Sequence, residues 1–125
     1  MELFSKKELS EADIKRKYIT PAIEKKWNPD HIRMEAKITD GRINLKGNNV
    51  VRERCKYADY LLYLNNGKPI AVVEAKDNNH LVSEGIKQAK EYAEMMDIQC
   101  VYSSNGDAFH EYDLLTRKER VIPLD

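Results

Sequence analysis

The feature that most constrains the fold is a pair of short apolar runs on either side of Asn65-Asn66-Gly67-Lys68. The runs cover residues 60–64 and 70–73. Asn-Gly between hydrophobic runs is the strongest short-range signal for a β-hairpin, because both residues tolerate the positive φ that tight turns need. A two-residue loop at Asn66-Gly67 predicts antiparallel pairs that begin at Asn65 with Lys68.

Periodic patterns on both sides of this hairpin predict helices and further strands. Ser10 is a candidate N-cap for an opening helix that Pro21 kinks or restarts, with Thr20 as a second cap. The remaining patterns predict strands at 32–38, 98–102, 108–114 and 120–122, a helix at 81–96, and mostly loop at 39–56. The order predicts an α/β (α+β) fold, a mixed central sheet flanked by helices. With 125 residues there is no room for a second core, so we expect one domain over residues 1–125.

Composition excludes several function classes. Lys and Arg number 21 and balance 21 Asp and Glu, which argues against a general polyanion binder but not against a local basic patch. Cys55 and Cys100 form no CxxC pair and, with three scattered histidines, no zinc spacing, so we expect reduced thiols in a cytoplasmic protein. The sequence has no secretory signal, no apolar run long enough for a membrane span and no phosphate-binding loop for ATP.

The predicted hairpin register brings two candidate functional residues together. It places Asp59 opposite Glu74, with Cβ atoms roughly 4.5–5.5 Å apart. Like charges in direct opposition cost stability unless a cation compensates, and carboxylates with water are ligands typical of Mg²⁺. Lys76 lies on the same strand face as Glu74 because side chains alternate along a strand.

Acid-x-Lys triplets are common in this chain, so their context decides between them. The triplets begin at Asp13, Glu24, Glu35 and Glu74. The first two lie on the predicted opening helix and are interpreted as a solvated face. The triplet Glu35-Ala-Lys37 is on a predicted strand, but no hairpin brings an acid beside it. Only Glu74 has a strand partner in Asp59.

These residues carry a resemblance to a known family. Ala58-Asp59, the hairpin and Glu74-Ala75-Lys76 resemble the PD-(D/E)XK nuclease signature, with Ala58 in place of the proline. The longer string ADYLLYLNNGKPIAVVEAK, the Gln88-x-x-x-Tyr92 element and VYSSNGDAFHEYD resemble the N-terminal nuclease domain of type I restriction enzyme R subunits. The opening SEADIKRKYITPAIEKKW is also similar to that family, so the resemblance covers nearly the whole chain.

The resemblance implies a restriction-endonuclease-like core and a role for each matched residue. Asp59, Glu74 and the backbone carbonyl of Ala75 would hold Mg²⁺, for which Mn²⁺ could substitute. Lys76 would orient the attacking water. The supporting residues that the resemblance implies are Gln88 and Tyr92, which would hold DNA or brace the site, and Glu11 as an accessory acid.

The resemblance also implies partners outside this chain. The chain would be a fragment of a longer R subunit of a prokaryote, cytoplasmic, with an ATP-driven translocase in the remainder. Its partners would be double-stranded DNA and the modification and specificity subunits, with no membrane. Two alternatives stay open: a non-catalytic DNA-binding or assembly module with a nuclease fold, and a stand-alone PD-(D/E)XK repair or junction nuclease. The basic excess in residues 42–56 is either a phosphate contact or a solvated loop.

Overall fold

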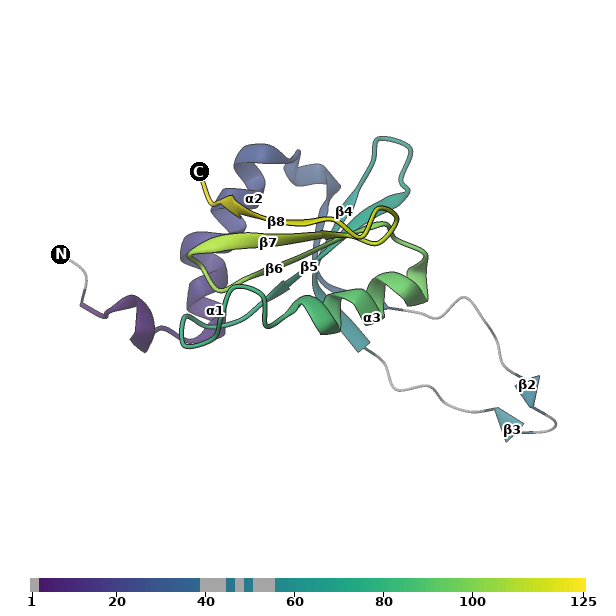
Figure 1. Cartoon of the computed structure of the whole chain (residues 1–125), viewed down its shortest axis with the longest axis horizontal. Helices are drawn as coiled ribbons and strands as arrows, with labels where there is room; N and C mark the ends of the chain where they lie inside the picture. The colour runs from purple at the N-terminus through teal and green to yellow at the C-terminus, as the bar shows by residue number, and fades with distance from the viewer. Residues whose placement is uncertain (1–2, 39–44, 47–48, 51–55) are drawn as a thin grey trace.

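The computed structural model describes residues 3–38, 45–46, 49–50 and 56–125, and a six-stranded mixed sheet forms its centre. The strand order is β1-β4-β5-β6-β7-β8, with β5 and β6 parallel and every other neighbouring pair antiparallel. The strands of this sheet are β1 (Ile32–Ile38), β4 (Lys56–Tyr63), β5 (Pro69–Ala75), β6 (Cys100–Ser104), β7 (Ala108–Asp113) and β8 (Glu119–Pro123). The predicted mixed sheet with flanking helices is confirmed (Figure 1).

The stretch predicted as loop contains a second, two-stranded sheet of β2 (Leu45–Lys46) and β3 (Asn49–Val50). The rest of residues 39–55, including most of the basic stretch, lies outside the described residues.

The turn of the central hairpin differs from the predicted two-residue loop. The Leu64 N–H donates to the Lys68 carbonyl and the Gly67 N–H donates to the Leu64 carbonyl, each at 2.9 Å. Gly67 has a φ of +81°, so the loop is the three-residue type in which a glycine follows a tight turn. The register then shifts by one residue between Leu62 and Tyr63. This shift restores the predicted alignment, and Leu61 pairs with Val72 as expected.

The opening helical region is continuous but contains a π-helical turn. It consists of α1 (Glu11–Ile14), the π-helical η2 (Lys15–Ile19) and α2 (Thr20–Lys26). The predicted cap is confirmed, because Ser10 Oγ accepts from the Asp13 N–H at 3.1 Å. Thr20, expected as a second cap, is instead helical, and its hydroxyl lies 2.6 Å from that of Tyr60. Pro21 is the second residue of α2, just after the π-helical turn, so the change of helix type falls next to the proline that was expected to kink or restart the helix.

The helix predicted from residue 81 begins five residues later, as α3 (Ile86–Met96). Leu81 is 69% exposed and thus does not belong to the buried stripe of this helix. Two short 3-10 helices, η1 (Lys6–Glu8) and η3 (Pro29–His31), complete the described elements.

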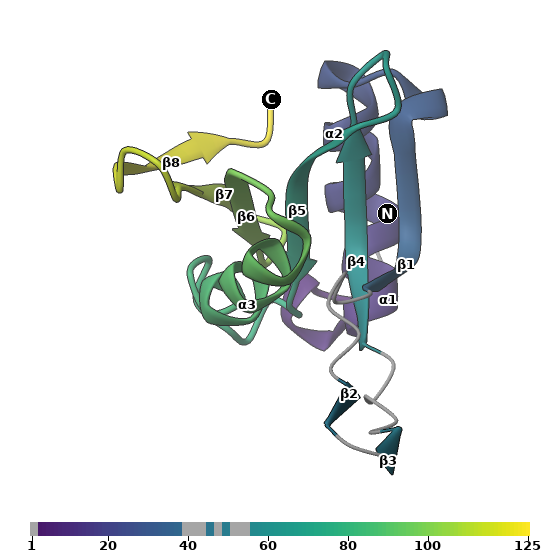
Figure 2. The same cartoon turned by 90° about the vertical axis from the view of Figure 1, so that its right-hand side faces the viewer.

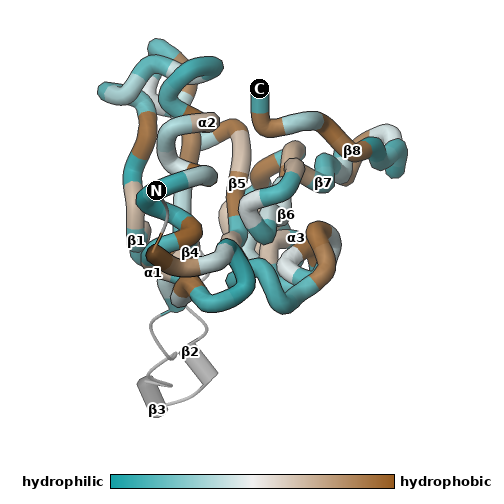
Figure 3. Tube along the Cα trace, turned by 90° about the vertical axis from the view of Figure 1, so that its left-hand side faces the viewer, coloured by the Kyte–Doolittle hydropathy of each residue, from teal (hydrophilic) through white to brown (hydrophobic). Residues whose placement is uncertain are grey.

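Two hydrophobic clusters pack on opposite faces of the sheet. The α1–α2 region covers a face that contains Tyr60, Leu62 and Val73, whereas α3 covers the face that contains Leu61 and Val72. Figure 2 shows these helices on the two sides of the central strands, and Figure 3 shows the apolar residues along those strands. In the described part of the chain, no helix is long and apolar enough to span a membrane.

Candidate active site

Asp59 and Glu74 come together where β4 and β5 lie side by side. The Asp59 N–H donates to Glu74 Oε1 at 3.2 Å, and the Ala75 N–H donates to Asp59 Oδ2 at 2.8 Å. Each carboxylate thus accepts from the backbone of the opposite strand, just beyond the last regular pair of Tyr60 with Val73. The pairing predicted from the hairpin register therefore puts the two acids in contact.

Glu74 is held in an environment that disfavours its negative charge. The residue is only 8% exposed. Burial, followed by the contact with Asp59, raises the pKa of Glu74 to about 9. Glu74 therefore favours its protonated form at neutral pH unless an added cation compensates its charge.

Sequence reasoning missed Lys15, a cation that contacts Asp59 of the acid pair. Its Nζ lies 2.5 Å from Asp59 Oδ1 and 3.0 Å from Glu35 Oε1. The prediction that the triplet at Asp13 lies on a solvated face is wrong for Lys15, which is only 8% exposed. Lys15 and Ile19 are both buried and stand four residues apart, a spacing that places them on one helix face, so Lys15 lies on the buried face next to Ile14. Its charge is what made the sequence pattern indicate a solvated position.

The interpretation of Glu35 also needs correction. The pairs Met34 with Tyr60 and Ala36 with Ala58 flank Glu35, so β1 places this acid opposite Asp59. We expected no acid beside Glu35 because no hairpin joins it to one, but β1 and β4 pair across a long connection. Glu35 has a φ of +50°. Its side chain contacts Lys15 but is still 65% exposed.

Glu11 lies within electrostatic range of Asp59, and Lys76 lies within electrostatic range of Glu11. Burial raises the pKa of Glu11, the charge of Asp59 raises it further, and the charges of Lys15 and Lys76 oppose this rise. Lys76 directly follows β5, is half-buried, and donates its backbone N–H to the Ser104 carbonyl at 2.8 Å. The accessory acid and the lysine named from the sequence thus belong to the same electrostatic environment.

The two α3 residues named from the sequence differ in their surroundings. Tyr92 is 8% exposed, and its pKa is raised first by burial and then by the charges of Glu74 and Asp59. Gln88 is half-exposed, and its side chain donates to Glu91 at 3.3 Å along the same helix. The charges of the acid pair therefore act on Tyr92, whereas the hydrogen bond of Gln88 joins it to another residue of α3.

Close packing fixes the start of α3 against Glu74. The Gly85 N–H donates to Ser103 Oγ at 2.8 Å. A Cβ atom added at Gly85 would lie 2.6 Å from Ser103 Oγ and 3.1 Å from Glu74 Cβ. Glycine is required here because the backbone approaches both side chains.

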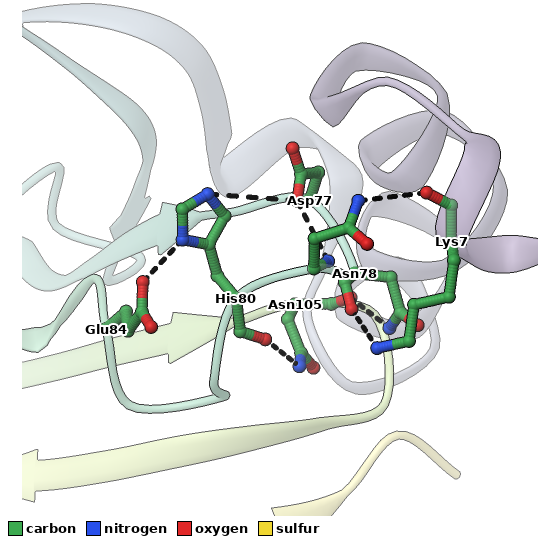
Figure 4. A network of polar contacts seen from close by, with 7 residues as sticks. Lys7, Asp77, Asn78, His80, Glu84 and Asn105 are labelled. Atoms are coloured by element: carbon green, nitrogen blue, oxygen red, sulfur yellow. Dashed lines mark hydrogen bonds and ion pairs between the residues drawn. The ribbon is translucent and has the colours of Figure 1, made fainter.

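The loop that follows Lys76 is held by a separate polar network (Figure 4). Asn78 donates to the Asn105 carbonyl at 2.9 Å, and Asn105 donates to the His80 carbonyl at 2.6 Å. Lys7 Nζ donates to the Asn78 carbonyl, and His80 contacts Glu84. These contacts tie the loop to η1 and to the β6–β7 turn, so the end of β5 is fixed from two sides.

The donor set fits a hard divalent cation. Asp59 and Glu74 supply carboxylate oxygens, and the Ala75 carbonyl is adjacent in sequence. Over residues 3–38, 45–46, 49–50 and 56–125, no three or more His, Cys, Asp or Glu side chains are grouped as metal ligands. Mg²⁺ typically takes one or two carboxylates and keeps several waters, so two acids suffice for it, whereas structural zinc requires four protein ligands.

Comparison with known proteins gives one consistent result. The profile of the family described as type I restriction enzyme R protein N terminus matches residues 43–120. The type I restriction enzyme EcoAI endonuclease subunit of Escherichia coli is 43% identical over 123 residues, covering 94% of this chain and 15% of that protein. A solved fragment assigned to the HsdR subunit of a type I restriction enzyme from Vibrio vulnificus YJ016 aligns with a TM-score of 0.74 and 42% identity. This alignment covers 91% of this chain and 23% of that one.

This chain thus spans only a small part of the length of either relative. The family profile covers more than half of it, and its mixed sheet is shared with the solved fragment. The chain therefore belongs to the family of type I restriction enzyme R protein N termini.

Proposed function

We propose that this domain is the Mg²⁺-dependent nuclease of a type I restriction enzyme R subunit and hydrolyses phosphodiester bonds of double-stranded DNA. One observation carries the proposal: Asp59 and Glu74 are in contact between the central strands β4 and β5, where burial and that contact raise the pKa of Glu74. A stable protein tolerates such a pair when function requires it, because strongly perturbed pKa values cluster at functional sites. The family supports the same assignment, since its named relative is an endonuclease subunit.

Each residue has a distinct task in the proposed reaction. Asp59 and Glu74 would hold Mg²⁺, with the Ala75 carbonyl as a third ligand. The cation would supply an activated water and charge stabilisation for the leaving oxygen. Lys76 would orient the water and offset charge on the scissile phosphate. Tyr92 and Gln88 would brace the site or hold DNA, and Glu11 would assist as an accessory acid.

The proposal includes partners that this chain does not contain. Double-stranded DNA, the modification and specificity subunits, and an ATP-driven translocase in the rest of the R subunit would act with the domain. A neutral domain is expected to bind DNA weakly by itself, because phosphate contacts dominate affinity. Cleavage therefore needs to be measured in the assembled enzyme.

The test uses the reconstituted restriction enzyme with variants in this domain. Asp59→Ala, Glu74→Ala and Lys76→Ala should each abolish DNA cleavage while ATP hydrolysis continues. Glu24→Ala and Lys25→Ala, exposed on α2, are matched controls and should cleave normally. Full cleavage by all three site variants would refute the assignment and favour a non-catalytic module with a nuclease fold. Cleavage by the chain without its partners or ATP would favour a stand-alone repair nuclease.

A further inference from the structure

Lys15 is a buried cation that the proposed reaction does not use. Its side chain is 11% exposed, and its Nζ contacts one oxygen of Asp59 and one of Glu35. A cationic side chain in contact with a candidate metal ligand influences what binds there.

The site has a specific charge balance. The charges of Asp59 and Lys15 act on both Glu11 and Glu74, and the charges of Glu35 and Lys76 act on Glu11. With every group charged, the carboxylates exceed the ammonium groups by two, which is the charge of one divalent cation. These groups are Glu11, Glu35, Asp59 and Glu74 on one side and Lys15 and Lys76 on the other.

Asp59 is the point where Lys15 and a divalent cation would meet. Its Oδ2 accepts from the Ala75 N–H at 2.8 Å and its Oδ1 accepts from Lys15 at 2.5 Å. A cation bound to Asp59 must therefore share an oxygen with a hydrogen-bond donor. Because Lys15 is charged and little exposed to water, its repulsion of a nearby cation is weakly screened.

We propose that Lys15 is the resident counter-ion of the acid pair, which neutralises Asp59 in the metal-free protein and competes with the divalent cation for that carboxylate. Lys15 thereby sets how tightly the site binds metal. This inference rests on the proposed function, because it concerns the same metal site. It assigns Lys15 an effect on metal affinity and gives the N-terminal helical region a part in the site.

The test measures Mn²⁺ binding to the 125-residue chain by electron paramagnetic resonance of the free ion. Lys15→Met removes the charge and keeps the length of the side chain, and it should bind Mn²⁺ at least tenfold more tightly than the wild type. Lys15→Arg keeps the charge and should bind like the wild type. Lys17→Met, exposed on the same π-helical turn, is the matched control and should also bind like the wild type. Thermal unfolding gives a second readout, since saturating Mn²⁺ should raise Tm more in Lys15→Met than in the wild type.

A merely structural lysine would give a different result. If Lys15→Met folds and binds Mn²⁺ no more tightly than the wild type, the inference is wrong, whereas the proposed metal site stands. If neither protein binds millimolar Mn²⁺, both the inference and the metal site fail.

A measurement on the wild type covers the case in which Lys15→Met does not fold. The ¹⁵N resonance of the Lys15 ammonium group should shift as Mg²⁺ is added, together with the amide resonances of Asp59 and Ala75. An unchanged ammonium resonance, with those amides shifting, would overturn the competition between Lys15 and the cation.

Discussion

Replacing Glu74 by glutamine should stabilise the metal-free domain while removing its metal site. Glutamine has the shape of a protonated glutamate, so its side-chain oxygen can still accept from the Asp59 N–H, and its amide can donate to the Asp59 carboxylate. The native state of the wild type instead keeps a proton on this acid pair, because burial raises the pKa of Glu74 to about 9.

The sign and size of the effect follow from proton linkage. An acid whose pKa is raised by folding keeps its proton in the native state and releases it on unfolding, so the wild type loses stability as pH rises from 4.5 to about 9. The loss accumulates at about 1.4 kcal/mol per pH unit and reaches about 3 kcal/mol at pH 7. Glutamine does not titrate, so Glu74→Gln should exceed the wild type by up to that amount at pH 7, of order 10 °C in Tm.

Urea unfolding in EDTA at several pH values from 4.5 to 9 measures this difference. The stability advantage of Glu74→Gln should be smallest near pH 4.5, should grow with pH, and should level off near pH 9. Glu94→Gln, exposed on α3, controls for the general loss of a carboxylate. A Glu74→Gln protein that is less stable than the wild type at pH 7, or an advantage independent of pH, would refute the electrostatic account of the acid pair.

Two further substitutions test the surroundings of the acids. Gly85→Ala should cost about 1–3 kcal/mol and weaken Mn²⁺ binding, because the new methyl group would push on Ser103 and Glu74; urea unfolding and Mn²⁺ titration would measure both effects. Gly67→Ala is its matched control at the hairpin turn: it should lose about 1 kcal/mol through its positive φ without changing Mn²⁺ affinity, and equal affinity losses in the two variants would contradict the packing argument. Glu35→Gln should change stability by less than about 1 kcal/mol, because the side chain is largely exposed, and should leave DNA cleavage by the assembled enzyme intact. Loss of cleavage in a folded Glu35→Gln protein would place Glu35 among the reacting groups.

For the hairpin, the sequence pattern predicted the correct strand register but the wrong loop length. The Asn-Gly signal correctly located the turn, but the loop closes on Leu64 and Lys68 and not on Asn65 and Lys68. Without the register shift at Leu62, the acids would be offset by one residue and would point to opposite faces. The register shift between Leu62 and Tyr63 offsets the extra loop residue. No sequence motif at these positions predicts that shift.

The surroundings of the acid pair were less predictable because they come from distant segments. Asp59, Glu74 and Lys76 lie on one hairpin, where strand periodicity predicts which residues meet. Lys15 reaches Asp59 from the N-terminal helical region, 44 residues earlier, so no pattern local to the hairpin contains it. A local helical pattern predicts that such a lysine is exposed to solvent, since charged residues on amphipathic helices usually face water.

The site is therefore assembled from more of the chain than the residues that the family profile matches. The family profile covers residues 43–120, which include the hairpin and α3, whereas Lys15 and Glu35 precede it. Yet Lys15 compensates the charge of Asp59 in the metal-free state, and β1 places Glu35 where Lys15 can bridge the two acids. If the resident counter-ion is required for a stable metal-free domain, the N-terminal helical region and the hairpin form one functional unit. The electrostatics of the acid pair then explain why the helical region packs against this end of the sheet, in addition to the apolar contacts that hold it there.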